Sequence, residues 1–399
     1  MAPDVLLILT LSVTLWISPF LAKALRIPTP PIEIILGTLL AAAGFLHENR
    51  YFDLIAEMGF LYLMFLAGME VNLKEISESP RLVIRQAILF VLTLGILAVA
   101  SGLLLNFSPI VIASLPLISI GLLASLTKIY GRSQPWLNLS IIVGVLGEIA
   151  SIAALTILDA ASNVGFGWEL VFQISYLLFF IAAIYLTYRL LQLLFWWFPE
   201  LKKKLMPSRD SSDQDIRLAM ALFFLLITVM MILHLELALG AFIAGVAISA
   251  FFHHEKSLEE KMSSLGFGFL VPLFFIHVGV SFDLSALFLP GVFTGALLIT
   301  GVMILLRLIA AYPLRRLSDT LDAVSVAFAL SMPLTLLIAV ATIGYDTGNI
   351  DRITYYELIL ASLFEVIIAM SAIKIIARYR ERKKREEWKR EKQEALSSR

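Results

Sequence analysis

A single glutamate interrupts one of the most apolar stretches of the chain. Glu148 lies in the middle of LNLSIIVGVLGEIASIAALTIL, residues 137–158, which is long enough to cross a bilayer as a helix. A bare carboxylate at this depth is costly and is seldom kept without a use. Gly144 and Gly147 leave the backbone open on the approach to it. Such a carboxyl can hold a proton or, once ionised, a metal cation, so Glu148 predicts proton-coupled ion transport.

Two further charges lie inside apolar segments. Arg307 follows GALLITGVMILL and is expected about one and a half turns from the cytoplasmic edge of its span. Its guanidinium either snorkels to the interface or turns inward as the counter-charge of a carboxylate, with Glu148 as the expected partner. Glu365 sits in the middle of the last apolar segment and is a candidate second titrating site.

Prolines interrupt two apolar segments at corresponding positions. One segment is SPIVIASLPLISIGLLASL, with Pro116 near its middle, and the other contains SMPLT, with Ser331, Pro333 and Thr335. Proline removes an amide donor and frees a carbonyl one turn earlier, so backbone polar groups become available to an ion. We expect two broken helices that meet an ion near the membrane midplane, the alternative being plain proline kinks.

The composition sets the class of protein that must position these residues. Of the 399 residues, 59% are hydrophobic and 16% charged, which excludes a water-soluble globular fold. The formal net charge of +0 gives no electrostatic case for nucleic acid binding, and the absence of cysteine excludes disulfides and thiolate metal sites. Asp4 precedes the first apolar run without a basic residue, so we expect a retained first span and not a signal peptide. The chain is predicted to be an all-α integral membrane protein.

Apolar windows predict about thirteen transmembrane helices. They lie near 4–22, 31–47, 54–72, 82–105, 109–127, 137–158, 168–198, 216–233, 236–252, 264–282, 290–312, 321–344 and 353–377. With the N-terminus outside, the external loops hold only Arg50 and Arg352 of the 31 Lys and Arg residues. The positive-inside rule therefore predicts a cytoplasmic C-terminus.

The order of the predicted spans indicates an inverted repeat. Residues 1–198 would form a first six-helix repeat plus a linking seventh helix, and 199–215 a cytoplasmic linker. Residues 216–377 would form a second six-helix repeat of opposite polarity, typical of secondary transporters. The tail, 378–399, has mixed charges at helical spacing and is expected to continue the last helix into the cytoplasm. Its charges anchor the topology, or else bind a partner or lipid headgroups.

Motifs for enzymes are missing from the sequence. It contains no HExxH, GxSxG or P-loop, and no GxGxxG after a soluble strand. Tyr345 and Asp346 lack the partner GxGD of an intramembrane aspartyl protease. We therefore expect neither an enzyme nor a catalytic residue, bound metal or cofactor.

Several segments, in order, resemble the monovalent cation:proton antiporter superfamily in its Kef-type and bacterial sodium exchanger branch. PPIEIILGTLL is similar to the family's early Pro-Gly-Glu motif, and GFLYLMFLAGMEVNL to its third-span pattern. ELALGAFIAGVAIS followed by LVPLFFIHVGVSFDL is the most specific match. The resemblance implies a homodimer, with a dimerisation domain and a six-helix core in which two broken helices cross. Kef-type members often end in a nucleotide-binding regulatory domain, whereas only a short charged tail follows the last predicted span here, so we expect no such domain.

The resemblance also assigns roles to individual residues. Glu148 falls on the family's essential carboxylate, Ser119 near the Ser-Thr pair of the first broken helix, and Arg307 on the basic residue before the second. Gly147 stands where relatives usually have Asp, Asn or Gln. We expect an antiporter of the cell (inner) membrane that exchanges Na+, K+ or Li+ for protons by alternating access. The alternatives are a sodium-coupled organic solute symporter of similar fold and a cation channel.

Overall fold

The described part of the chain is built from helices. The computed structural model describes residues 3–25, 28–71, 78–131, 134–164, 213–233, 237–252, 256–285 and 289–397, with isolated positions between 168 and 197. Among these residues the secondary structure is helical, with turns and no strand. Eight helices are long and apolar enough to cross a membrane, or nine if one bent pair counts as a single span. The predicted all-α membrane fold is confirmed.

Helices occupy the predicted spans that lie within the described residues. Their bounds are α1 Pro3–Leu25, α2 Thr29–Ala42, α3 Arg50–Glu70, α5 Arg81–Leu104, α6 Pro109–Ser114, α7 Leu123–Tyr130, α8 Pro135–Val164, α11 Gln214–Ile232, α12 Leu237–Phe252, α13 Lys256–Leu265, α14 Val271–Ser281, α15 Val292–Ala310, α16 Thr320–Ala329, α17 Leu334–Asp346 and α18 Arg352–Ser397. A π-helical turn, η1 Gly266–Leu270, joins α13 to α14, and a 3-10 helix, η3 Tyr312–Arg316, follows α15. The predicted seventh span and the linker after it fall largely outside the described residues, so the total of thirteen stays a prediction.

The two proline-containing spans are both interrupted. The first consists of α6 and α7, separated by a non-helical stretch from Leu115 to Leu122 that contains Pro116. The second consists of α16 and α17, which are bent by 43° at a short break that contains Pro333. Each break therefore lies where a missing proline N–H ends the hydrogen-bond ladder, as the sequence predicts.

Polar side chains fix where the half-helices begin. Ser108 caps α6 by accepting a hydrogen bond from the Val111 amide, and Pro109 follows it at the first helical position. Asp319 caps α16 by accepting from the amides of Leu321 and Asp322. These caps satisfy amide groups that would otherwise lack partners at the ends of the two interrupted spans.

The chain divides into two compact units, each built from separate stretches of sequence. Unit 1 comprises Met1–Pro80, Ile149–Phe293 and Ala339–Tyr356. Unit 2 comprises Arg81–Glu148, Thr294–Ile338 and Glu357–Arg399, and it contains both helix breaks. Each unit thus takes segments from both predicted repeats, and the two-repeat division of the sequence remains a prediction.

Unit 1 is held together by helices whose backbones approach closely. Helix α3 packs along α12, and α2 packs along α14. A Cβ atom added at Gly245 of α12 would lie less than 3 Å from backbone atoms of Phe65, Gly68 and Met69 on α3. Small residues allow such contacts in membrane bundles, where van der Waals packing replaces the hydrophobic effect between helices.

Gly245→Ala is therefore expected to destabilise the protein by about 1–3 kcal/mol, because the added methyl forces the two backbones apart. The measurement is unfolding of the purified protein in detergent, by heat or by denaturing detergent. Gly268→Ala is the matched control, since a Cβ there meets nothing within 4 Å. Equal losses of stability in the two variants would contradict the proposed close packing.

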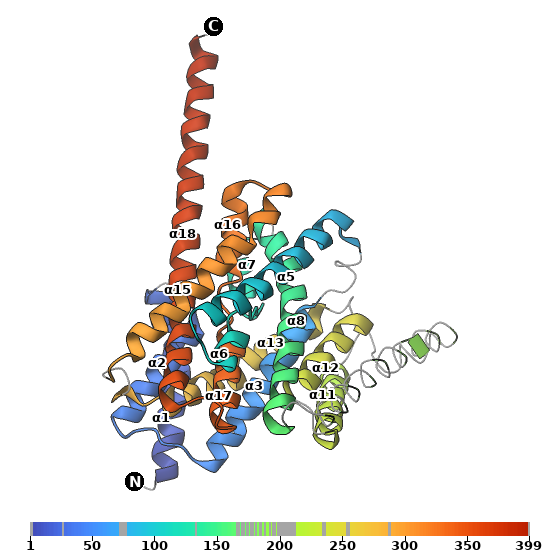
Figure 1. The fold of residues 1–399 in the computed structure, drawn as a ribbon, viewed down its shortest axis with the longest axis vertical. Coiled ribbons are helices and arrows are strands. Elements are labelled where there is room, and N and C mark those ends of the chain that lie inside the picture. Colours follow the sequence, from blue (N-terminus) through green and yellow to red (C-terminus); the bar gives the residue numbers. More distant parts are fainter. Residues whose placement is uncertain are drawn as a thin grey trace. The chain divides into compact units, whose positions relative to one another are not determined.

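Helix α18 continues without interruption from the last predicted span into the charged tail. It runs 46 residues, from Arg352 to Ser397, and lies at the C-terminal end of the chain (Figure 1). Just beyond the predicted end of the span, Arg380 pairs with Asp322 of α16 at 2.6 Å. The predicted helical continuation of the tail is confirmed, and its first turns contact the second broken helix.

Candidate functional site

Glu148 lies in unit 2, on helix α8. The residue is fully buried, with 0% of its surface exposed. Gly144 and Gly147, on the same helix, leave room that the side chains of Ile118 and Ile120 fill. Both isoleucines belong to the break between α6 and α7, so the two glycines allow the broken backbone to come close to the carboxyl group.

Two donors from the first break bind the carboxylate of Glu148. The Ser119 hydroxyl donates to Oε1 at 3.3 Å, and the backbone amide of Ile120 donates to Oε2 at 3.2 Å. The Ile120 amide is free to do so because the chain between α6 and α7 is not helical. An amide released from a helix thus partly replaces the water that an ionised carboxylate would otherwise need.

The second break reaches the same cluster through Thr335. Its Oγ1 lies 3.4 Å from Ser119 Oγ, and both residues are buried. Since the Ser119 proton is directed to Glu148, the Thr335 hydroxyl donates to Ser119. The hydrogen bonds then run from Thr335 through Ser119 to the carboxylate, so residues of both interrupted spans converge on Glu148.

This arrangement suits a group that exchanges a proton for a cation. A protonated carboxyl donates one hydrogen bond and is neutral, whereas an ionised one accepts only and attracts a cation. Carboxylate and hydroxyl oxygens are hard ligands, which fits an alkali cation better than a soft metal. Hydroxyl groups can also rotate to present either a proton or a lone pair, so Ser119 and Thr335 can serve both states of Glu148.

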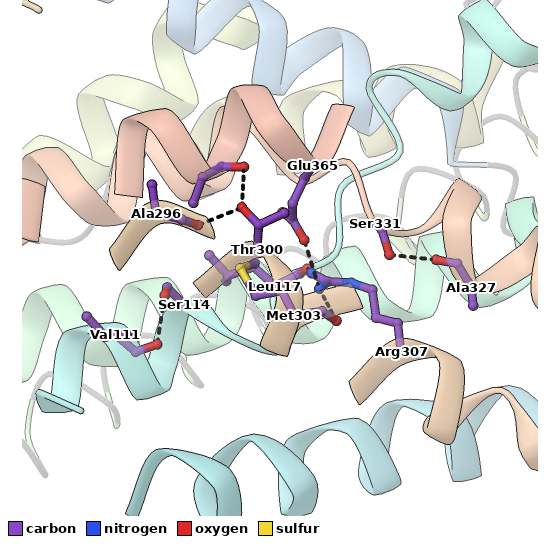
Figure 2. Close-up of polar contacts among 11 residues, drawn as sticks. Val111, Ser114, Leu117, Ala296, Thr300, Met303, Arg307, Ala327, Ser331 and Glu365 are labelled. Atoms are coloured by element: carbon purple, nitrogen blue, oxygen red, sulfur yellow. Dashed lines mark hydrogen bonds and ion pairs between the residues drawn. The ribbon is translucent and has the colours of Figure 1, made fainter. Parts of the chain in front are cut away.

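Arg307 is the largest fully buried side chain described, with 0% exposed surface. Its Nη1 donates to Glu365 Oε1 at 3.2 Å and to the Met303 carbonyl at 2.9 Å (Figure 2). Of the two alternatives that the sequence leaves open, snorkelling is wrong and the inward-facing counter-charge is what the structure shows, because the guanidinium is fully buried beside a carboxylate. The expected pairing with Glu148 is also wrong, since Glu365 on α18 is the carboxylate that Arg307 contacts.

The same guanidinium reaches the first helix break. Its Nη2 donates to the carbonyl of Leu117, two residues before Ser119 (Figure 2). The pair is incompletely satisfied, because Arg307 Nε and Glu365 Oε2 are buried without hydrogen-bond partners in the described part of the chain. Arg307 thus acts on the break that carries Ser119 and Ile120, whereas the sequence suggested direct contact with Glu148.

The remaining predicted site residues lie in the same unit with different contacts. Ser331, in the second break, donates to the Ala327 carbonyl of α16 at 2.8 Å (Figure 2). Within the described part of the chain it is not among the hydrogen-bond partners of Glu148. Pro116 and Pro333 lie in the two breaks. Thr300, which was not among the residues predicted for the site, is buried on α15 and donates to the Ala361 carbonyl of α18 at 3.4 Å. A hydroxyl group within an apolar span is the feature of the sequence that could have marked this residue.

Comparison with protein families gives a match along nearly the whole chain. The family described as "Sodium/hydrogen exchanger, transmembrane" matches residues 8–379. The matched range includes both helix breaks, Glu148, Arg307 and Glu365.

Relatives and a solved structure agree with this match. "Putative Na(+)/H(+) antiporter YjbQ" of Bacillus subtilis is 25% identical over 86% of this chain, which spans only 58% of that relative's length. The "Na(+)/H(+) antiporter" of Enterococcus hirae is 25% identical over 90% of this chain and 94% of its own. The structure of the sodium proton antiporter MjNhaP1 from Methanocaldococcus jannaschii aligns with a TM-score of 0.63 at 16% identity. That alignment covers 94% of this chain and 97% of the other, and it supports a shared fold.

Proposed function

Since the chain belongs to the sodium/hydrogen exchanger family, we propose that it exchanges a monovalent cation for protons by alternating access, with Glu148 as the site that both ions share. Relatives of this chain are named as Na(+)/H(+) antiporters, which makes sodium the first cation to test. Potassium and lithium are further candidates, because carboxylate and hydroxyl oxygens suit each of them. With this function the protein is a membrane transporter and not an enzyme.

The observation that carries this proposal is the convergence of both interrupted spans on one buried carboxylate. Glu148 accepts hydrogen bonds from Ser119 and Ile120 in one break, and Ser119 contacts Thr335 at the other. Discontinuous helices at corresponding positions of two halves mark substrate sites in secondary transporters. The exchange of a proton for a cation at Glu148 would therefore change the contacts of both spans at once, which suits a site that alternates between the two sides of the membrane.

The ion pair beside the site supports a division of roles. Arg307 and Glu365 contact each other, and Arg307 also binds the Leu117 carbonyl of the first break. We assign them to holding the break in place, while Glu148 carries the ions. Glu365, which the sequence offered as a candidate second titrating site, is here assigned the role of counter-charge to Arg307.

The experiment that tests the function is a pH-dye assay in proteoliposomes. Purified protein is reconstituted, a proton gradient is imposed, and sodium, potassium and lithium are added in turn. We expect dissipation of the gradient by at least one of these cations. Proton flux that no alkali cation triggers, or flux that instead requires an organic anion, would reject cation:proton exchange and favour a solute symporter. Single-channel currents would favour a channel.

The hydroxyl groups beside Glu148 provide the next prediction. Ser119→Ala and Thr335→Val are each expected to lower the exchange rate several-fold to about tenfold, the equivalent of one hydrogen bond of about 1–1.5 kcal/mol. Ser140→Ala is the matched control, because this buried hydroxyl on the same helix as Glu148 donates to the Trp136 carbonyl. Rates are measured in proteoliposomes with the amount of inserted protein determined. A loss in Ser140→Ala as large as in the other two would contradict the assignment.

Exchange is expected to be electroneutral. Gly147 adds no second carboxylate beside Glu148, and the paired charges of Arg307 and Glu365 cancel. One proton would then move against one monovalent cation, and no net charge would cross the membrane. A potential of 100 mV does work of about 2.3 kcal/mol on each translocated charge, so only charge-carrying exchange responds to it. Sodium-driven proton flux is measured with and without a potassium-valinomycin potential, and acceleration by voltage would contradict the one-carboxylate mechanism.

A further inference from the structure

Two arginines at the start of α5 lie in a shallow groove outside the proposed ion site. Within the described residues this groove, of about 290 Å³, is lined by Arg81, Ile84, Arg85, Ile88 and Leu89. Both arginines are exposed, and neither makes a hydrogen bond or ion pair within the described part of the chain. Because they are four residues apart on a helix, their guanidinium groups lie on one face. The groove thus presents two unpaired positive charges above aliphatic side chains.

The arginines stand at the end of a long apolar stripe. The face of α5 that carries Arg85 continues with Leu92, Ile96 and Leu103, which are 57%, 70% and 66% exposed. The opposite face of α5 is buried inside unit 2 through residues such as Phe90 and Leu94. The 18 helical steps from Arg85 to Leu103 span about 27 Å at the α-helical rise, close to the thickness of a bilayer core.

Neighbouring residues extend the basic end of this surface. Helix α5 packs against η3, which carries Arg315 and Arg316 and begins with the exposed Tyr312. Arg315 lies over the Tyr312 ring at 5.4 Å from the ring centre. Tyrosine and arginine in such positions are typical of the membrane interface. By the positive-inside rule this end of α5 is expected at the cytoplasmic surface.

We propose that this surface binds an anionic phospholipid of the cytoplasmic leaflet. The phosphate group lies between Arg81 and Arg85, whose planar guanidinium groups match phosphate oxygens, and one acyl chain follows the stripe of Leu92, Ile96 and Leu103. A free phosphate would use only the basic end of the surface. A second copy of the chain fits poorly, since α5 contains no acidic residue to neutralise the arginines of a partner's α5.

The lipid site is tested by native mass spectrometry of the full-length protein released from mixed phosphatidylcholine and phosphatidylglycerol. We expect the wild type to retain phosphatidylglycerol, and Arg81→Gln/Arg85→Gln to retain it about thirtyfold less strongly. The control, Arg378→Gln/Arg382→Gln, removes two exposed arginines with the same spacing from α18 and should retain the lipid as the wild type does. The readout is lipid binding, so it is independent of ion exchange.

Four outcomes would overturn this proposal. Equal losses in both double variants would indicate general attraction between basic residues and anionic lipid. Undiminished retention in Arg81→Gln/Arg85→Gln would place the lipid elsewhere. Retention of soluble glycerol phosphate as strong as that of phosphatidylglycerol would show that the acyl chain contributes nothing. A light-scattering mass of each variant in detergent accompanies these measurements, and a change of oligomeric state in Arg81→Gln/Arg85→Gln alone would assign the surface to a second copy.

Discussion

Glu148→Gln is expected to abolish cation:proton exchange while the protein stays folded and inserted. Glutamine has the shape of glutamate, and its side-chain oxygen can still accept a hydrogen bond from the Ile120 amide. It can neither release a proton nor supply the negative charge that attracts a cation. The exchange rate in proteoliposomes should therefore fall to that of empty liposomes, with an unchanged elution profile and unfolding temperature.

Glu33→Gln is the matched control for this experiment. Glu33 is 2% exposed on α2 and accepts a hydrogen bond from Ser18 at 3.1 Å, so it is also a buried carboxyl held by a serine. It lies in unit 1, away from both helix breaks in the sequence, and its variant should exchange ions at close to the wild-type rate. Normal exchange by Glu148→Gln would move the proposed site elsewhere, and Glu365 would be the next carboxyl to test.

Removing Glu365 is expected to destabilise the protein more than any other single substitution proposed for unit 2. In Glu365→Leu the buried guanidinium of Arg307 loses its counter-charge. Removing one partner of a buried ion pair lowers the free energy of unfolding by about 3–5 kcal/mol. Arg307→Met should cost less, because the remaining carboxyl can take up a proton and become neutral, whereas a guanidinium keeps its charge. Unfolding in denaturing detergent measures both variants.

The double variant Arg307→Met/Glu365→Leu separates a pair from two independent residues. If the two charges stabilise each other, the double variant should be more stable than Glu365→Leu alone, since no unpaired charge remains. Part of the loss should persist, because the Leu117 carbonyl no longer has its Arg307 donor. Additive losses from the two substitutions would contradict an energetic pair.

The sequence predicts the helices and their interruptions because both depend on local chemistry. Apolar runs of bilayer length specify the spans, and Pro116 and Pro333 remove amide donors wherever the surrounding chain folds. The structure interrupts both helices at these prolines, although the first break extends from Leu115 to Leu122 and so is longer than a single kink. Glu148 is also identified locally, as a carboxylate with apolar neighbours on every side.

Contacts between distant segments are harder to predict. Ser119 and Thr335 are 216 residues apart in the chain, and nothing in either segment alone selects the other as its partner. The expected partner of Arg307 was wrong for a related reason. Glu148 is the carboxylate that its local sequence marks most clearly, but no local sequence shows which carboxylate lies next to Arg307 in the fold. Depth along the helices favours Glu365 as the partner, because Arg307 and Glu365 lie about 22 and about 20 Å from the starts of α15 and α18, at 1.5 Å per residue. Both spans run in the same predicted direction, so the two charges reach similar depths.

The hydrogen bonds that Glu148 and Arg307 make with backbone groups could not be predicted from the sequence. The Ile120 amide and the Leu117 carbonyl belong to residues with apolar side chains, so no residue type marks them as polar partners. They become available only because the chain between α6 and α7 leaves the helix. The proline predicts that some backbone groups are freed, but the three-dimensional fold decides which of them meet Glu148 and Arg307.

Proton release on cation binding tests most directly whether one carboxyl serves both ions. Sodium is titrated into the purified protein in detergent by calorimetry, in buffers of different ionisation enthalpy, so that the number of released protons follows from the buffer dependence of the heat. If Glu148 holds both ions, the wild type should release about one proton for each sodium ion bound, and Glu148→Gln should show neither binding heat nor proton release. Sodium binding that persists in Glu148→Gln, or that releases no proton from the wild type, would contradict this role of Glu148.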